Sequence, residues 1–344
     1  MKQQVGVLLV QLGTPDAPTY FAVMRYLRQF LSDRRVIEVP TPIWLPLLYG
    51  VILPFRSSAS AAKYRLIWHP ETGSPLMHYS RRQTELLQAQ MPDVLVRFGM
   101  QIGRPSVRSV IQEMIEAGVE RLIVMPMYPQ YSATTTASAT DAVFKALMRV
   151  RRVPAVRIVA PYYDHPAYLD ATAAIVREEL AKLTWEPDHF LISYHGIPQK
   201  YAKRGDPYAT HVVRTTRGLV ERLGLARHQW TQTYQSRFGR SPWLKPYTDE
   251  TLEKLAHRGI RKVFAITPGF TADCLETIDE IGREAREEFQ HAGGELLHQC
   301  RCLNDHPQWI AAMRAIILDE ARGWLPTEAA TTHARESAPA VTMV

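Results

Sequence analysis

The sequence is poor in cysteine and has no leader-like start. Its 344 residues include three cysteines, Cys274, Cys300 and Cys302, all in the last quarter of the chain. A small, odd number of cysteines argues against the disulfide framework of a secreted protein, so we expect free thiols and a cytoplasmic location. The apolar run near the N-terminus, Val5–Val10, is shorter than the core of a signal peptide, which needs at least about 7 apolar residues. We interpret it as the first strand of a domain.

Motifs of several common enzyme classes are also missing. No two glycines are separated by a single residue, which excludes the dinucleotide fingerprint G-x-G-x-x-G. The phosphate-binding pattern G-x-x-x-x-G-K-S/T, the hydrolase pattern G-x-S-x-G and the zinc pattern H-E-x-x-H do not occur. Lys and Arg total 41 against 34 Asp and Glu, but the basic residues are scattered. We therefore expect no nucleic-acid partner, whereas an anionic membrane surface or an acidic small molecule remains open.

The longest apolar stretch extends from Pro42 to Phe55 and contains three prolines. It is shorter than the ~20 residues that a membrane-spanning helix needs. Two interpretations stay open. The stretch is a buried, irregular crossover between elements, or it is an apolar lip at a pocket mouth that contacts a membrane or an apolar ligand.

Apolar runs alternate with amphipathic stretches along the chain. The apolar runs predict strands at residues 5–12, 94–100, 121–125, 156–160, 190–194, 230–234 and 262–266. The amphipathic stretches predict helices at residues 19–31, 57–68, 75–91, 106–117, 136–152, 166–182, 207–223, 249–258, 274–291 and 307–324. This alternation is typical of an α/β fold with doubly wound parallel sheets. We expect one α/β lobe at residues 1–160, a second at 161–326 and a disordered tail at 327–344.

Two short patterns occur once in each half of the chain. Val10-Gln-Leu-Gly-Thr-Pro15 ends the first predicted strand, and Ser193-Tyr-His-Gly-Ile-Pro198 ends the strand near the midpoint. Val124-Met-Pro-Met-Tyr128 likewise resembles Ile266-Thr-Pro-Gly-Phe270. Ligands of open parallel sheets bind beyond the carboxyl ends of the strands. The pattern therefore predicts two similar lobes around one cleft, whose walls include Leu12, Tyr128, His195 and Phe270.

His195 is the strongest chemical candidate among the histidines. It ends a predicted central strand and precedes Gly196, whose lack of a side chain lets a ligand approach closely. Imidazole accepts a proton or binds a metal near neutral pH. His195 therefore has a position and a chemistry that suit catalysis.

Glu276, Glu280 and Glu284 recur at every fourth position of a predicted helix, which places three carboxylates on one face. They form either a solvated face, partly neutralised by Arg283 and Arg286, or a ladder that carries a divalent cation inward. Imidazole together with carboxylates suits ferrous iron. With aromatic walls that include Trp243, the cleft would suit a flat, apolar ligand that exchanges protons for a metal ion.

At this point the sequence resembles the ferrochelatase family over roughly residues 5 to 322. The order and spacing of its short motifs carry the resemblance: Gln11-Leu-Gly-Thr-Pro15, Phe30-Leu-Ser-Asp-Arg34, Gly73-Ser-Pro75, Tyr128-Pro-Gln-Tyr-Ser132, Ser193-Tyr-His-Gly196, Arg204-Gly-Asp-Pro-Tyr208, Gln235-Ser-Arg-Phe-Gly239, Pro242-Trp-Leu244 and Phe270-Thr-Ala-Asp-Cys-Leu-Glu276. The resemblance implies two Rossmann-like lobes of the flavodoxin type around a porphyrin cleft. It implies insertion of Fe2+ into protoporphyrin IX, with release of two protons, in the last step of haem biosynthesis.

The resemblance also assigns roles to individual residues. His195 and Glu276 fall on the family's active-site histidine and glutamate, and Glu280 and Glu284 on its acidic ladder. The implied metal-handling residues are therefore His195, Glu276, Glu280 and Glu284. The implied porphyrin contacts are Leu12, Tyr128, Phe270 and Trp243 as pocket residues, with Arg56, Tyr64 and Ser74 for the propionates; Arg28 is a further cation for them.

Some positions depart from the family pattern. Cys274 stands where many members have a histidine, and Met100 and Gln101 stand where others have an Arg–Tyr pair. Members with a two-iron, two-sulfur cluster need four cysteines, so we expect no such cofactor here, with iron only as substrate. A chelatase for another ion and a non-catalytic tetrapyrrole carrier remain alternatives. Oligomeric state and contact of Pro42–Phe55 with the inner membrane face stay open.

Overall fold

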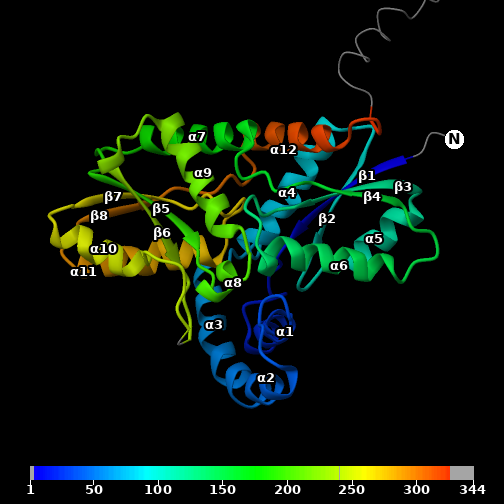
Figure 1. Ribbon diagram of the computed structural model, residues 1–344, viewed down its shortest axis with the longest axis horizontal. Coiled ribbons are helices and arrows are strands. Elements are labelled where there is room, and N and C mark those ends of the chain that lie inside the picture. The colour runs from blue at the N-terminus through cyan, green and yellow to red at the C-terminus, as the bar shows by residue number, and fades with distance from the viewer. Residues whose placement is uncertain (1–3, 240, 326–344) are drawn as a thin grey trace, which may run out of the picture.

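The computed structural model describes residues 4–239 and 241–325, which form two parallel four-stranded sheets (Figure 1). The first sheet contains β1 (Gln4–Gln11), β2 (Leu95–Met100), β3 (Val119–Pro126) and β4 (Ala155–Ile158) in the order β2-β1-β3-β4. The second contains β5 (His189–His195), β6 (Trp230–Gln235), β7 (Lys262–Ile266) and β8 (Leu296–Gln299) in the order β6-β5-β7-β8. The predicted two-lobed α/β fold is confirmed, and the predicted tail at 327–344 falls outside the described residues.

Helices cover both faces of each sheet, which is why the central strands β1 and β5 are buried along most of their length. The α-helices are α1 (Tyr20–Leu31), α2 (Thr41–Leu47), α3 (Leu53–Ile67), α4 (Pro75–Gln90), α5 (Val107–Glu116), α6 (Ser138–Leu147), α7 (Pro166–Ala181), α8 (Gln199–Lys203), α9 (Tyr208–Leu223), α10 (Thr248–His257), α11 (Arg286–His291) and α12 (Pro307–Glu320). Three segments are π-helical, η1 (Leu48–Ile52), η2 (Ala133–Ala137) and η4 (Glu276–Ala285), and η3 (Arg227–Gln229) is a 3-10 turn.

The two lobes share part of their interior. Helices α7 and α12 run side by side along the top of Figure 1, and α12 also packs against α4 of the first lobe. One apolar cluster contains Leu9 of the first sheet, Ile192 of the second sheet and Trp309 of α12. The predicted lobe boundary near residue 160 therefore stays a prediction, because the core does not divide there.

The strand orders of the two sheets are equivalent, with β1 in the place of β5 and β3 in the place of β7. Gly13 and Gly196 occupy matching positions after β1 and β5, as the repeated patterns predict. A Cβ atom on Gly13 would lie 1.7 Å from the carbonyl oxygen of Ile102, and one on Gly196 would lie 3.0 Å from that of Gln235. Each glycine lets the chain pass close to the end of the neighbouring strand.

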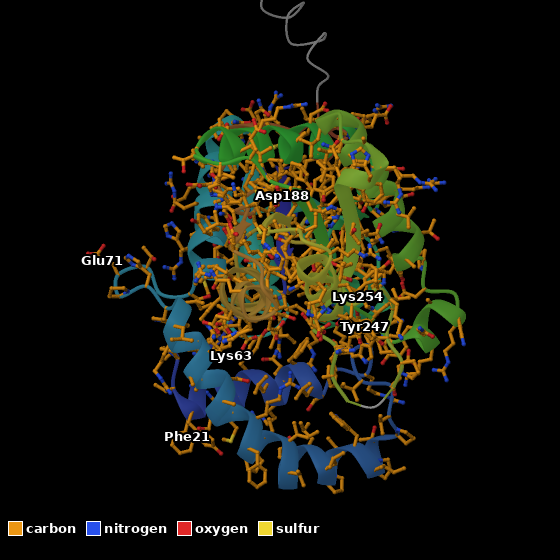
Figure 2. All side chains as sticks on the ribbon, turned by 90° about the vertical axis from the view of Figure 1, so that its left-hand side faces the viewer. Phe21, Lys63, Glu71, Asp188, Tyr247 and Lys254 are labelled. Carbon is orange, nitrogen blue, oxygen red and sulfur yellow. The ribbon has the colours of Figure 1, made fainter. Side chains whose placement is uncertain are left out.

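The segment Pro42–Phe55 is helical and largely exposed, so its interpretation as a buried, irregular crossover is wrong. Helix α2, the π turn η1 and helix α3 follow one another without a break. Proline is tolerated in a first helical turn, and the π turn lies just where Pro54 withdraws an α-helical hydrogen bond. We call the exposed apolar side chains here the apolar lip; they are Phe21, Ile43, Leu47, Tyr49, Val51 and Phe55. Figure 2 shows this region at the bottom of the molecule, with Phe21 labelled.

None of the helices in the described part of the chain is long and apolar enough to cross a bilayer. The short strand β8 was not among the predicted strands, because the two leucines of Leu296–Gln299 are too brief a run to stand out.

Candidate functional site

His195 is held at the end of β5 with one ring nitrogen directed to the backbone. Its Nδ1 lies 2.7 Å from the carbonyl oxygen of Gly196. A carbonyl only accepts hydrogen bonds, so Nδ1 carries a proton, and Nε2 is the ring atom that can offer a lone pair. The hydroxyl of Tyr208 donates to the backbone oxygen of His195 at 2.9 Å, and the ring of Trp243 lies 6.4 Å away between centroids. The half-buried imidazole is thus fixed as a base or ligand.

The strand order brings His195 and Glu276 to the same place. His195 ends β5, Glu276 follows the loop after β7, and these two strands are neighbours in the sheet. After β5 the chain continues to β6 on one side of this pair, and after β7 it continues to β8 on the other side. The gap between β5 and β7 is therefore the switch point of the sheet. Ligands of doubly wound sheets bind in such crevices.

Gln235 links the histidine strand to the acidic helix. This buried residue ends β6 opposite His195, and its Nε2 donates to the carbonyl oxygen of Glu276 at 2.8 Å and to Glu280 Oε2 at 3.2 Å. Its Oε1 accepts from Ser193 Oγ at 2.8 Å. The side-chain amide of Gln235 therefore sets the distance between β5 and the first turn of η4.

Glu280 is the ladder carboxylate most affected by its surroundings. Burial raises the pKa of Glu280, and the negative charge of Glu276 raises it further. Hydrogen bonds from Gln235 and from Ser236 Oγ, at 2.5 Å, oppose this pKa shift, as does attraction to His195. A carboxylate with a raised pKa accepts protons more readily near neutral pH.

Glu284, the third member of the predicted ladder, is ion-paired. Lys63 of α3 lies 2.6 Å from its carboxylate, and Arg283 lies 3.1 Å from it. The same two cations hold Asp279, whose side chain is 1% exposed, with Arg283 at 2.6 Å and Lys63 at 3.8 Å. Figure 2 labels Lys63 next to the helix of the second lobe. The outer end of the ladder is therefore neutralised, whereas Glu276 and Glu280 at the inner end have no ion pair with any cation in the described part of the chain.

A group of buried tyrosines surrounds Glu276 on the first lobe. Burial raises the pKa of Tyr26, Tyr64 and Tyr128, and the charge of Glu276 adds to the shift in each case. Their hydroxyls remain protonated at neutral pH and act as donors. The Tyr128 hydroxyl donates to Gln101 Oε1 at 3.3 Å, while Tyr26 and Tyr64 meet edge to face at 6.3 Å. Leu12 packs in the same apolar cluster as Tyr64.

Arg56 is connected to Trp243 through Phe238. The guanidinium of Arg56 lies 5.4 Å from the centre of the Phe238 ring, and that ring lies 5.1 Å from the ring of Trp243. The indole Nε1 of Trp243 donates to the backbone oxygen of Phe238 at 3.0 Å. This places a cation, two aromatic rings and His195 in sequence along one side of the site.

Two predicted contact residues lie in other surroundings. Ser74 is buried, stands immediately before α4 without a capping side-chain hydrogen bond, and accepts from Thr14 Oγ1 at 2.8 Å. Phe270 packs in a small apolar cluster with Leu76 and Cys274. Burial raises the pKa of the Cys274 thiol, with Glu276 as the next cause, so this thiol is neutral. Of the predicted residues, His195, Glu276 and Glu280 are thus linked through Gln235, and Arg56 and Trp243 through Phe238, whereas Ser74 bonds to Thr14 and Phe270 packs beside Cys274.

Sequence reasoning missed Gln235, Tyr26 and Lys63 as site residues. Gln235 begins one of the motifs that carried the resemblance, so a signal for it was present. Tyr26 and Lys63 lie outside these motifs. Within the described residues, no group of three or more His, Cys, Asp or Glu side chains is arranged to hold a metal.

Known proteins match this chain in sequence and in fold. SirB from Bacillus subtilis with Fe3+ superposes with a TM-score of 0.53 over 97% of this chain and 98% of that chain, at 13% identity. The sirohydrochlorin chelatase SirB of B. subtilis subspecies spizizenii, in complex with cobalt, gives 0.52 over 93% and 97%, at 10% identity. At these identities the likeness shows the fold alone.

The sequence matches are much closer. The ferrochelatase of Mesorhizobium japonicum is 48% identical over 326 residues, which cover 94% of this chain and 92% of that protein. The ferrochelatase of Brucella ovis is also 48% identical and covers 94% and 93%. The family model for ferrochelatase matches residues 4–321. The chain belongs to the ferrochelatase family.

Proposed function

We propose that His195, Glu276 and Glu280 are the groups with which this chain carries out its family's reaction, insertion of Fe2+ into protoporphyrin IX. The observation that carries the proposal is the junction at Gln235, which ties the strand of His195 to the backbone of Glu276 and to the carboxylate of Glu280 at the switch point of the second sheet. An imidazole and two carboxylates at one crevice provide both ligands for ferrous iron and acceptors for protons.

The reaction replaces two pyrrole N–H protons by one metal ion, so the site needs two proton acceptors. His195 Nε2 is one, because Nδ1 is already engaged as a donor to Gly196. Glu280 is the other, since its raised pKa matches a proton acceptor better than that of an ordinary carboxylate. Glu276, at the start of the helix and between these groups, would hold the incoming iron.

The porphyrin propionates would bind on the other side of the site. Arg56 supplies a permanent cation above Phe238, and Tyr64 supplies a protonated hydroxyl. Trp243, Leu12 and Tyr128 would contact the apolar macrocycle. In this arrangement Glu284 serves as the paired outer end of the ladder, and Ser74 and Phe270 support the site from behind.

The direct test is metal insertion by the purified chain. Fe2+ under anaerobic conditions, or Zn2+, is added with protoporphyrin IX, and the absorbance change of the metalloporphyrin is followed. Wild type should turn over, and Glu276→Gln should lose at least about 100-fold in kcat, as expected for loss of a group acting on the reacting atoms. A Glu276→Gln variant with wild-type kcat would refute the assignment.

The apolar lip would rest on the cytoplasmic face of a membrane, where it could take up an apolar porphyrin. Ile43 is 65% exposed and Phe55 76% exposed, and neither has a polar atom on its side chain. Contiguous exposed apolar groups of this kind mark interaction surfaces. Trp44 is unsuited to a test, because its Nε1 donates to the backbone oxygen of Leu31 at 2.7 Å and holds the lip together.

Vesicle sedimentation tests the lip. Ile43→Ser/Phe55→Ser should reduce the fraction bound to anionic vesicles several-fold. Phe144→Ser/Met148→Ser, which changes two apolar residues exposed elsewhere on the surface, should leave it unchanged. Equal binding by wild type and the lip variant would contradict the membrane role.

A further inference from the structure

A loop of the first lobe is held by residues of the second lobe. We call residues 128–138 the wall loop; it follows β3, begins with Tyr128 and leads through η2 into α6. Its middle residues Gln130, Tyr131 and Ser132 each form a hydrogen bond to the second lobe. Gln130 is 3% exposed and Ser132 is 1% exposed, so the junction lies in the interior of the protein.

Two of these hydrogen bonds reach helix α9. Gln130 Nε2 donates to Thr215 Oγ1 at 2.9 Å, and the backbone N–H of Tyr131 donates to His211 Nδ1 at 3.1 Å. Burial lowers the pKa of His211, whose ring also stacks on Tyr163 at 3.8 Å between centroids. The imidazole is therefore neutral near pH 7 and keeps the lone pair that the backbone N–H needs.

Asp206 is the residue of this junction that has partners in both lobes. Its Oδ2 accepts from Ser132 Oγ at 2.9 Å and from the backbone N–H of Ala133 at 2.8 Å, both in the wall loop. Its Oδ1 accepts from the backbone N–H of Tyr208 at 3.0 Å, in the first turn of α9. Hydrogen bonds to a carboxylate are roughly twice as strong as those between neutral groups, so this one side chain joins the two segments firmly.

On the side of the second lobe, the carboxylate leads to His195 through Tyr208. The Tyr208 hydroxyl donates to the backbone oxygen of His195 at 2.9 Å. Burial raises the pKa of Tyr208, so the hydroxyl keeps its proton and remains a donor. The first turn of α9 therefore determines where the end of β5 and its imidazole lie.

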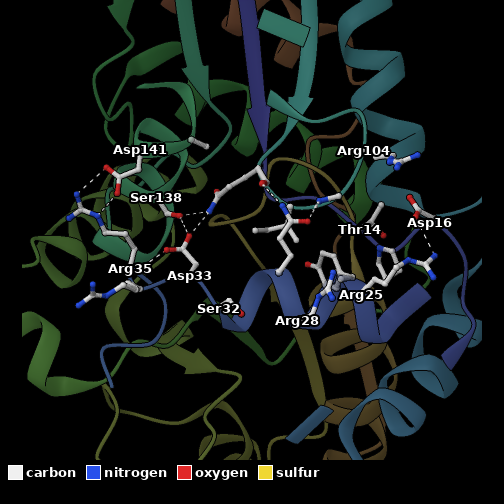
Figure 3. A pocket seen from close by; sticks show the side chains of 18 of the residues that line it. Thr14, Asp16, Arg25, Arg28, Ser32, Asp33, Arg35, Arg104, Ser138 and Asp141 are labelled. Atoms are coloured by element: carbon white, nitrogen blue, oxygen red, sulfur yellow. Dashed lines mark hydrogen bonds and ion pairs between the residues drawn. The ribbon is translucent and has the colours of Figure 1, made fainter. Parts of the chain in front are cut away.

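On the side of the first lobe, the same carboxylate leads to the porphyrin wall. The Tyr128 hydroxyl donates to Gln101 Oε1 at 3.3 Å, and Gln101 Nε2 donates to Ser138 Oγ at 2.5 Å, so both ends of the wall loop meet at one residue. Ser138 donates in turn to Asp33, and Figure 3 shows these two at the cavity that Tyr26 also lines. The ends of the wall loop thus lie at the site, and its middle is bound to the second lobe.

We propose that Asp206 is a positioning residue for metal insertion, which holds Tyr128 of one lobe and His195 of the other in register across the porphyrin. It acts through Ser132 on one side and through Tyr208 on the other. The inference rests on the proposed function, since it gives Asp206 a part in that same reaction. Reacting groups must be held to a fraction of an ångström, so loss of either link should change the reaction on its own side.

Steady-state kinetics of Zn2+ insertion into protoporphyrin IX test the two links separately. Ser132→Ala removes the hydroxyl that binds Asp206 on the first lobe, and it should raise KM for the porphyrin by about 5-fold with kcat within about 2-fold of wild type. Tyr208→Phe removes the donor to the His195 backbone, and it should lower kcat by about 10-fold with KM within about 2-fold. Asp206→Ala removes both links and should show both changes.

Asp188→Ala is the matched control. Asp188, labelled in Figure 2, accepts from the backbone N–H groups of Arg261 and Lys262 at 2.9 Å each, and it precedes β5 at the end opposite His195. The variant loses the same charge and the same kind of hydrogen bonds as Asp206→Ala. It should leave kcat and KM unchanged, whereas a loss of stability alone would lower the melting temperature of both aspartate variants without separating kcat from KM.

A second measurement does not depend on metal insertion. The ring resonances of His195, recorded by nuclear magnetic resonance on isotope-labelled protein and assigned with His195→Ala, should shift in Tyr208→Phe and in Asp206→Ala. They should not shift in Asp188→Ala. Unshifted resonances in a folded Asp206→Ala protein would overturn the link to His195.

The kinetic results decide the rest. The proposal is overturned if Asp206→Ala keeps the kcat and KM of wild type, or if Asp188→Ala is equally impaired. It is also overturned if Ser132→Ala and Tyr208→Phe change kcat and KM in the same proportion. Failure of the proposed function shows separately, as a wild type that inserts no metal or a fully active Glu276→Gln, and the His195 resonances still report on Asp206 in either case.

Discussion

Replacement of Gln235 by methionine tests how the two inner carboxylates are positioned. Methionine has a similar length and no hydrogen-bonding amide. The change removes the donor to the Glu276 carbonyl at 2.8 Å, the donor to Glu280 Oε2 at 3.2 Å and the acceptor for Ser193 Oγ at 2.8 Å. The backbone of η4 and the charge of Glu280 both lose a partner, while Ser236 still donates to Glu280.

The size of the effect follows from these contacts. A buried polar group left without its partner costs about 1–3 kcal/mol, so the free energy of unfolding should fall by about 2–4 kcal/mol. Loss of the hydrogen bond from Gln235, which lowers the pKa of Glu280, should raise that pKa further. Glu280 must be ionised to accept a proton. As the pH is lowered, the kcat of the variant should therefore fall at a higher pH than the kcat of wild type.

The assay is the pH profile of kcat for metal insertion, with urea unfolding measured on the same variants. Gln232→Met is the control, because Gln232 lies on the same strand and donates only to Tyr234 at 3.2 Å. Gln235→Met should shift the acid limb of the profile to higher pH, and the control should not. An unshifted limb in a Gln235→Met protein that is folded would refute the positioning argument.

Three other changes have defined outcomes. Lys63→Met should lower the free energy of unfolding by about 1–3 kcal/mol, because it removes a cation beside the buried Asp279. The control is Lys254→Met, which removes an exposed ion pair with Glu250 at 3.9 Å. In the same urea titration it should lower the free energy of unfolding by less than about 1 kcal/mol. Glu280→Gln should raise the melting temperature at pH 7 while insertion activity falls. The pKa of Glu280 is raised above 4.5 by folding, so its ionisation near neutral pH opposes folding, and glutamine removes this opposition. An unchanged or lower melting temperature would contradict the raised pKa. The Cys274 thiol should react with iodoacetamide at least about 10-fold more slowly in the folded protein than in urea, since it is buried and its pKa is raised. Mass spectrometry measures the rate of alkylation at Cys274, and equal rates in the two conditions would contradict this prediction.

Hydrophobic periodicity predicted most of the fold, since seven strands and ten helices stand out as separate patterns. It failed where the pattern was brief or broken. Strand β8 has only two leucines to mark it. For Pro42–Phe55 the sequence left a buried crossover and an exposed lip equally open, because prolines usually end helices. Here Pro42 and Pro54 lie in first turns, Pro46 lies inside α2, and the π turn η1 precedes Pro54.

The candidate site was predictable where the residues belong to motifs at strand ends. His195 and Glu276 are of this kind, since the parallel topology alone brings the ends of β5 and β7 together. The pairing of Glu284 was not predictable, because it depends on Lys63, more than 200 positions earlier in the chain and on the other lobe.

The most direct test of the account is metal insertion by His195→Ala. The variant should bind protoporphyrin IX, as shown by quenching of porphyrin fluorescence, and should keep the far-ultraviolet circular dichroism of wild type. Its kcat for Zn2+ or Fe2+ insertion should fall by at least about 100-fold. Wild-type kcat in this folded, porphyrin-binding variant would contradict the assignment of His195 as one of the two proton-accepting groups.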